Sequence, residues 1–195
     1  MQKKIVWAIC IIMLFLFSGL VHANDLSQLF GQVEKLKIER YGYVLGAALN
    51  QDQMETAAAN PVDSSSKDTY KFKDKNLFVV AQKKSNRVLV IYEQFKDASQ
   101  EKIQGLIGDL YIKYDDPTVL AHDKVVYWAY TKKGKLTSQE FGTARQNKKK
   151  LDILATVKFI SDIHIMEKSK EPSKGQVYYI ISSDPILKFF KDQKT

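Results

Sequence analysis

The sequence lacks most of the residues and motifs that carry common enzymatic chemistry. It contains 1 cysteine, Cys10, and 3 histidines. It has no GxSxG, HExxH, calcium-loop, GxGxxG or Walker pattern. These absences argue against the common serine hydrolase, zinc, calcium and nucleotide sites, so we predict no metal site and no cofactor.

The first 23 residues have the pattern of a secretory signal peptide. A basic start with Lys3 and Lys4 precedes an apolar run, and the segment ends in the small residue Ala23. The run is shorter than the roughly 20 residues that a membrane span requires. We therefore predict cleavage between Ala23 and Asn24, a periplasmic or secreted location, and no stable membrane anchor after cleavage. An uncleaved transmembrane anchor is the alternative.

Cleavage at that bond would leave a chain without cysteine, since Cys10 lies inside the apolar run. The chain would then have no thiol for nucleophilic catalysis, for a lipid anchor at the cleavage site or for a disulfide. A chain of this size buries roughly 70% of its unfolded surface without cross-links. We expect residues 24–195 to form one domain that is held together by its core.

Positive charge is the strongest compositional feature. The formal net charge is +8, and it becomes +6 after cleavage because the removed segment carries two lysines and no acid. For an exported protein this balance favours anionic lipids, wall polymers or acidic proteins over nucleic acid. A lysine-rich surface that simply maintains solubility is the alternative interpretation.

Apolar and aromatic alternation predicts several β-strands. The clearest is 125–130, which is followed by a polar turn containing Gly134 and a return strand. Further strands are expected at 41–49, 70–73, 77–81, 88–92, 153–165 and 177–181. In the segment 153–165 every second residue is apolar or small, which is typical of an antiparallel sheet with one dry face. Continuous apolarity at 77–81 and 88–92 indicates burial on both faces or a central position in the sheet.

Helical periodicity is confined to a few segments. An N-terminal helix is expected to end near Arg40, and a second helix follows an Asp97–Gln100 capping box and runs to Tyr114. A short helix follows Ser183-Asp184-Pro185. The segment 50–60 is compatible with either a helix or a loop. The composition of 141–150 predicts a polar loop, and that of 167–175 predicts a charged turn.

These elements predict an α+β fold, in which two or three amphipathic helices pack on one face of a curved antiparallel sheet. The succession of a helix and then strands occurs twice, at about 50–95 and about 99–165. An internal duplication is therefore a hypothesis.

Candidate binding residues lie on the predicted strand faces. Trp128 and Tyr130 share one face of their strand and would line a groove, or else pack in the core. Lys158, Asp162 and His164 lie on the polar face of the segment 153–165, either as a site or as a solvated ion-pair face. Two basic groups flank the hairpin and would form an anionic docking patch or a solvated loop: Lys132, Lys133 and Lys135, and Arg145, Lys148, Lys149 and Lys150.

A capped helix, the turn Tyr114-Asp115-Asp116-Pro117-Thr118 and the strand Tyr127-Trp128-Ala129-Tyr130 occur in succession. This layout resembles the small BamE-like outer-membrane assembly proteins and the β-lactamase-inhibitor-like domains. The resemblance covers about 50 residues and implies an exported α+β module that binds proteins. No site residue is carried over from it.

The combined expectation is a non-enzymatic module of the cell envelope that binds a protein, wall or membrane component. A hydrolase, or a small-ligand carrier with a site on the sheet face, is the alternative.

Overall fold

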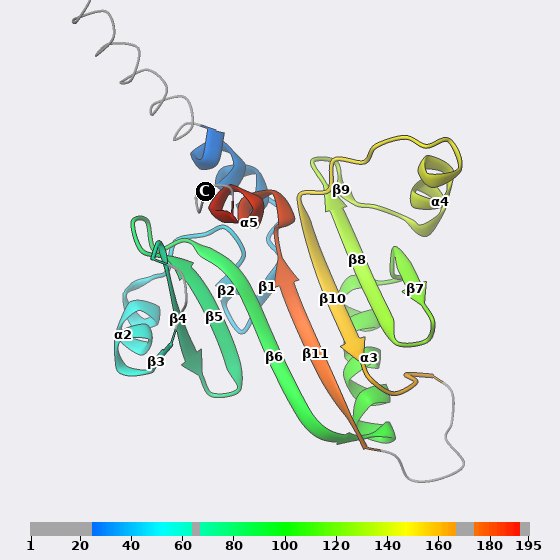
Figure 1. Cartoon of the computed structure of the whole chain (residues 1–195), viewed down its shortest axis with the longest axis horizontal. Helices are drawn as coiled ribbons and strands as arrows, with labels where there is room; N and C mark the ends of the chain where they lie inside the picture. The colour runs from blue at the N-terminus through cyan, green and yellow to red at the C-terminus, as the bar shows by residue number, and fades with distance from the viewer. Residues whose placement is uncertain (1–24, 64–66, 167–173, 192–195) are drawn as a thin grey trace, which may run out of the picture.

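The computed structural model describes residues 25–63, 67–166 and 174–191. The predicted signal peptide and most of the predicted turn at 167–175 lie outside these ranges. The described residues form an antiparallel sheet with helices around it, which confirms the predicted α+β class (Figure 1). The hydrogen-bonded strand order is β3 (Pro61–Val62), β4 (Thr69–Asp74), β5 (Leu77–Gln82), β6 (Val88–Ser99), β11 (Lys174–Ser182), β10 (Ala155–Ser161), β8 (Val125–Thr131) and β7 (Val119–Ala121), and β9 (Gly134–Lys135) pairs with β8.

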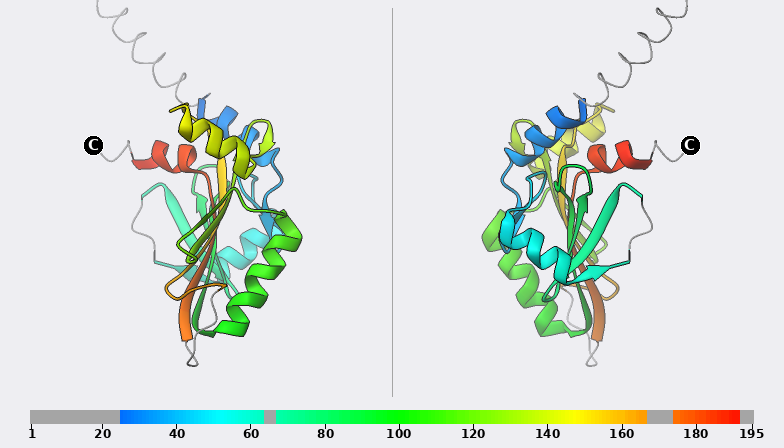
Figure 2. Two further views of the ribbon diagram at one scale, coloured as in Figure 1. Left: turned by 90° about the vertical axis from the view of Figure 1, so that its right-hand side faces the viewer. Right: turned by 90° about the vertical axis from the view of Figure 1, so that its left-hand side faces the viewer.

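The helices lie on both sides of this sheet. Two of them, α2 (Gln51–Ala59) and α3 (Gln100–Tyr114), cover the same face, as Figure 2 shows. The C-terminal helix α5 (Asp184–Lys191) lies at one end of the opposite face and contacts β10. An N-terminal helix over residues 25–34 and α4 (Ser138–Gln146) lie at that same end. We call the face opposite α2 and α3 the open face.

The middle of the sheet joins distant parts of the chain. Strand β11 lies between β6 and β10, and Ile181 is opposite Ile91 on one side and Val157 on the other. In two parts of the chain, a helix precedes three strands that are neighbours in the sheet: α2 precedes β4, β5 and β6, and α3 precedes β8, β10 and β11. The two sets of strands meet where β6 pairs with β11. The hypothesis of an internal duplication stays open, and in this topology its second unit would reach Ser182.

The core lies between the sheet and the α2–α3 layer. Its largest fully buried side chains include Trp128, Tyr179, Phe72 and Phe159. Helix α3 contributes the apolar stripe expected from its sequence: Ile103, Ile107, Leu110 and Tyr114 are buried. The Trp128 ring packs against Tyr114 and donates its Nε1–H to the backbone oxygen of Asp115 at 2.8 Å. Trp128 therefore has the packing role that was one of its two expected roles.

Two helix predictions were wrong in detail. Residues 141–146, part of the segment 141–150 that was expected to be a loop, belong to α4. The reason is local: Thr137 and Glu140 form a capping box, with the Glu140 N–H 3.1 Å from the Thr137 hydroxyl. The capping residue of α3 is Ser99 instead of Asp97, because β6 continues to Ser99, whose hydroxyl accepts from the Lys102 N–H.

Segment boundaries also differ near the N-terminus. The first helix ends at residue 34. Within the expected strand at 41–49, the one strand is β2 (Tyr43–Val44), which forms a small hairpin with the preceding β1 (Glu39–Arg40). The ambiguous segment 50–60 is helix α2, which starts from a capping box between Asn50 and Gln53.

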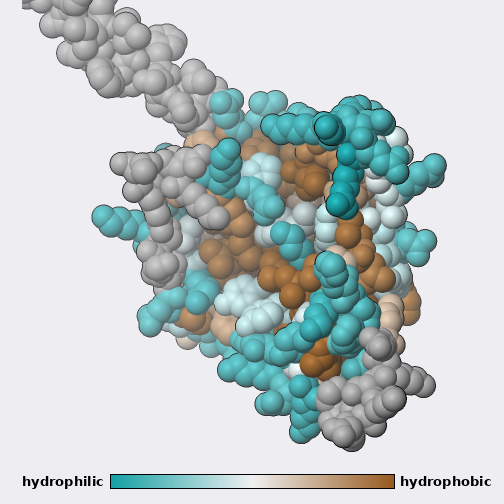
Figure 3. Space-filling view, turned by 45° about the vertical axis from the view of Figure 1, so that its right-hand side comes forward, coloured by the Kyte–Doolittle hydropathy of each residue, from teal (hydrophilic) through white to brown (hydrophobic). Residues whose placement is uncertain are grey.

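Opposite residues in neighbouring strands form a row across the open face. Phe78 of β5 faces Tyr92 of β6, then Ile180 of β11, Lys158 of β10 and Tyr127 of β8. These side chains are half-buried, and the Phe78 and Tyr92 rings stack at 4.8 Å between centroids. Burial on both faces, one of the two expectations for 77–81 and 88–92, is therefore not found. The other expectation, a position inside the sheet, holds for β5 and β6. Figure 3 shows apolar residues in the middle of the open face and hydrophilic residues around them.

Candidate functional site

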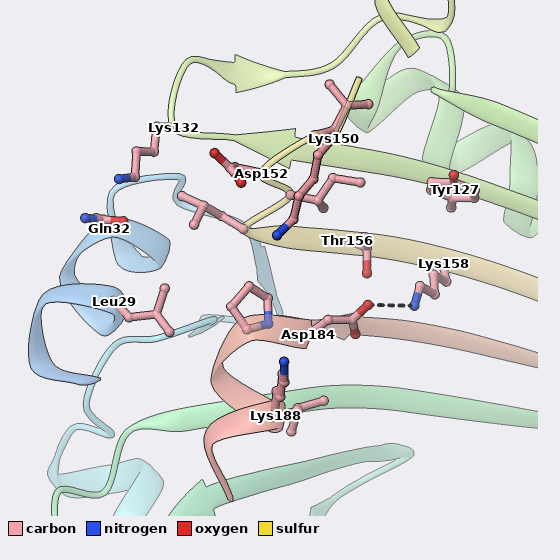
Figure 4. Close-up of a pocket in the computed structure, with 15 residues that line it drawn as sticks. Leu29, Gln32, Tyr127, Lys132, Lys150, Asp152, Thr156, Lys158, Asp184 and Lys188 are labelled. Carbon is pink, nitrogen blue, oxygen red and sulfur yellow. Dashed lines mark ion pairs between the residues drawn. The ribbon is translucent and has the colours of Figure 1, made fainter. Parts of the chain in front are cut away.

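A hollow of about 900 Å³ lies at the end of the open face, between the N-terminal helix, the start of β10 and α5 (Figure 4). We call it the lysine-rimmed groove. It is lined by Leu29, Gln32, Tyr127, Lys132, Lys150, Leu151, Asp152, Ile153, Leu154, Thr156, Lys158, Asp184, Pro185, Leu187 and Lys188.

The apolar lining comes from three separate segments. Leu29 lies on the N-terminal helix, Ile153 lies just before β10, and Leu187 lies on α5. Helix α5 is fixed in place because Ile186 is fully buried and its N–H donates to the Ser183 hydroxyl at 3.4 Å. This anchoring leaves Pro185 and Leu187 beside the groove.

The charged lining is unbalanced toward cations. Four lysines, Lys132, Lys150, Lys158 and Lys188, face two aspartates, Asp152 and Asp184. Among the described residues, the only ion pair that joins two of these side chains is Lys158 with Asp184, at 3.9 Å, and the Asp184 side chain is 68% exposed. In Figure 4 the amines of Lys150 and Lys188 point into the groove from opposite sides.

Thr156 is the least expected member of the lining. It lies on the same strand face as Lys158, between Ala129 of β8 and Ser182 of β11. The residue is 4% exposed, and its hydroxyl is the one buried side-chain oxygen or nitrogen without a hydrogen-bond partner in the described ranges. Buried polar groups are rarely left unpaired, because desolvation is then uncompensated.

A second hollow of about 470 Å³ continues the groove around the hairpin of β8 and β9. It shares Gln32, Lys132 and Leu154 with the groove and adds Lys35 and Lys133. Lys135 also lines it, but its amine already donates to the Tyr114 backbone oxygen at 2.7 Å. The cationic surface therefore extends from the groove around the β8–β9 hairpin.

The structure separates the predicted site residues. Trp128 lies in the core, whereas Tyr130 borders the second hollow, where burial raises the pKa of its hydroxyl. Lys158 lines the lysine-rimmed groove. The tryptophan and the lysine lie on opposite faces of the sheet, because Val157 is the residue opposite Trp128.

Asp162 and His164 lie past the far end of β10, away from the groove. The Asp162 carboxylate accepts from the Gln176 N–H at 2.7 Å, and His164 Nδ1 lies 3.5 Å from the Asp123 carboxylate. Lys158 is therefore not brought together with either residue, and the cleft that a hydrolase using these three side chains requires is not assembled.

Within residues 25–63, 67–166 and 174–191, no cluster of three or more histidine, cysteine, aspartate or glutamate side chains is placed to hold a metal ion. None of the described helices has the length and apolarity of a membrane-spanning segment.

Part of the groove was predicted from the sequence. Lys158 was a candidate binding residue, Lys132 and Lys150 belonged to the two basic groups near the hairpin, and all three lysines line the groove. Leu29, Thr156 and Lys188 were not predicted, since nothing in their local sequence indicates that α5 and the N-terminal helix flank β10.

Comparisons of this chain with family models, with curated proteins and with solved structures found no match. The geometry of the lysine-rimmed groove is therefore the basis for a functional assignment.

Proposed function

We propose that the protein is a non-enzymatic module of the cell envelope that binds an anionic partner in the lysine-rimmed groove. The observation that carries the proposal is the excess of four lysines over two aspartates around an apolar lining. Amines on an apolar surface attract an anionic partner, and the same surface buries the apolar part of that partner.

The chemistry of the lining favours binding over catalysis. Within the part of the chain that the structure describes, no histidine or cysteine lines the groove, and the Thr156 hydroxyl forms no hydrogen bond with Lys158 or Asp184. Nucleophilic catalysis requires a nucleophile within hydrogen-bond reach of a base. A small-ligand carrier remains compatible with the groove and differs from the main proposal only in the size of the partner.

The envelope location follows from residues 1–23 and is also a proposal. Intact mass and N-terminal sequencing of the secreted protein should place the new N-terminus at Asn24. A mature protein that still begins at Met1 would contradict the predicted cleavage. The resemblance to BamE-like and β-lactamase-inhibitor-like domains supports a protein partner as one form of the anionic ligand.

The groove is tested by reversing its charge. In the triple variant K132E/K150E/K188E, sedimentation of the protein with an isolated envelope fraction should be lost. The binding of the unmodified protein should weaken steeply with salt, because exposed charges are screened. A matched control, K75E/K96E/K102E, has the same net charge but changes exposed lysines away from the groove lining.

Equal binding by both triple variants would refute the groove as the binding site. Failure of the unmodified protein to bind any envelope fraction would refute the proposed function itself.

A further inference from the structure

The two ends of the lysine-rimmed groove carry different side chains. Thr156, Lys158 and Asp184 gather at one end, and Leu29 lies at the other with Gln32 and Lys132 near it, as Figure 4 shows. We propose that the groove holds a single-chain anionic amphiphile, with a carboxylate or phosphate head group at Thr156 and Lys158 and an alkyl chain directed toward Leu29. This inference rests on the proposed function and specifies the class of its ligand.

The size and lining of the groove fit such a ligand. Pockets for small molecules typically enclose about 300–1,000 Å³ and combine a mostly apolar wall with a few polar groups that fix orientation. The groove encloses about 900 Å³, and its apolar wall is assembled from Leu29, Ile153 and Leu187 on three segments. An alkyl chain gains affinity on this wall, whereas a free inorganic anion gains nothing from it.

The polar end lacks a partner that an anionic head group would supply. The Thr156 hydroxyl is buried without a hydrogen bond, and it is a donor that an anionic oxygen accepts from. Among the described residues, the one ion-pair partner of Lys158 is the exposed carboxylate of Asp184, at 3.9 Å. An arriving head group replaces Asp184 beside Lys158 and reaches the Thr156 hydroxyl.

Because the ligand displaces Asp184, substitutions at Asp184 and Lys158 test whether the ligand is anionic or cationic. For an anionic head group, D184N should tighten binding, because a competing and repelling carboxylate is removed. For the same ligand, K158M should weaken binding. A cationic ligand would reverse both effects. T156V should weaken anion binding several-fold while the melting temperature stays equal or rises, because the variant removes an unpaired buried hydroxyl.

The experiment is calorimetric titration of the protein lacking residues 1–23, with probes kept below their aggregation limits. The probes are decanoate, dodecanoate and tetradecanoate, then tetradecyl phosphate, tetradecanol, tetradecyltrimethylammonium and inorganic phosphate. Affinity should rise about fourfold for each added methylene, the equivalent of about 0.8 kcal/mol. The neutral and cationic probes should bind more weakly than the anions. K75M serves as the control and should bind as the unmodified protein does.

The two head groups distinguish the source of the anion: tighter binding of the phosphate indicates a phospholipid-derived ligand, and tighter binding of the carboxylate indicates a fatty acid. Inorganic phosphate that binds as well as tetradecanoate would overturn the inference. A T156V variant that binds as tightly as the unmodified protein would overturn the placement of the head group.

The failures of the two proposals are distinguishable. Loss of envelope binding in K132E/K150E/K188E, with no amphiphile bound by any variant, would leave the proposed function and overturn the amphiphile. Chain-length-dependent binding of amphiphiles, with no envelope fraction bound by the unmodified protein, would overturn the proposed function and leave the amphiphile.

Discussion

The replacement of Arg40 by methionine should destabilise the protein strongly, because Arg40 is the partner of a buried carboxylate. Glu93 of β6 is 3% exposed, and the Arg40 Nε donates to its carboxylate at 2.8 Å. The guanidinium of Arg40 also lies 4.8 Å from the centroid of the Tyr179 ring. Arg40 thus connects the β1–β2 hairpin to the middle of the sheet.

The magnitude follows from the burial of the pair. Removing one member of a buried ion pair costs about 3–5 kcal/mol, because the remaining charge is left without compensation. For a chain of this size, 1 kcal/mol corresponds to a change in melting temperature of about 2–4 °C, so R40M should melt roughly 6–20 °C lower.

The assay is denaturant unfolding followed by circular dichroism. The double variant R40M/E93L should recover most of the loss, since replacing a buried pair with apolar side chains is often neutral or stabilising. K113M is the control: the Lys113–Glu39 pair is 36% exposed on both sides and should contribute at most about 1 kcal/mol. A loss below about 1 kcal/mol in R40M, or no recovery in the double variant, would refute this reasoning.

Three further outcomes are expected. G46A should lower the free energy of unfolding by about 2–4 kcal/mol in denaturant, because Gly46 has φ +82° and a Cβ would lie 3.0 Å from the Phe30 backbone oxygen. The control G105A in α3 adds a Cβ that meets no atom within 4 Å, and it should raise the free energy of unfolding by up to about 1 kcal/mol. Equal effects of the two variants would contradict this account. W128F should lower the free energy of unfolding by about 1–3 kcal/mol in the same assay, since it removes ring volume and the hydrogen bond to Asp115. An unchanged free energy of unfolding would show that neither contributes to stability. The hydrogen bond from Lys113 lowers the pKa of Glu39 from 4.5, so this contact stabilises the fold above about pH 4.5, and its contribution is lost as the pH falls through the lowered pKa. In unfolding measured from pH 3 to 6, K113M should therefore lose less stability on acidification than the unmodified protein. An identical loss in both proteins would contradict the assignment.

The elements that sequence patterns identified are those with a strong local signal. The apolar stripe of α3 and the alternation of β10 follow from residues within a few positions of one another. Helix α4 has no comparable stripe, since Ala144 is its one buried residue, and its only clear signal is the capping box of Thr137 and Glu140. Weak amphipathicity therefore explains why this helix was expected to be a loop.

The candidate site depends on contacts between distant segments. Lys158 was placed correctly on the polar face of its strand, but the burial of Thr156 on the same face and its place in the groove depend on β8, β11 and α5. The apolar pattern at 177–181 identifies a strand without indicating that it separates β6 from β10. The pairing of strands that lie this far apart in the chain has no local sequence signature.

The position of β11 has a consequence for the order in which the chain can fold. Strands β6 and β10 have no direct pairing with each other, and both bond to residues 174–182. A ribosome must therefore synthesise nearly the whole described chain before the two halves of the sheet can join, and until then each half presents an unpaired edge. Such late closure gives slow folding and a long interval in which chaperones can bind the nascent polypeptide.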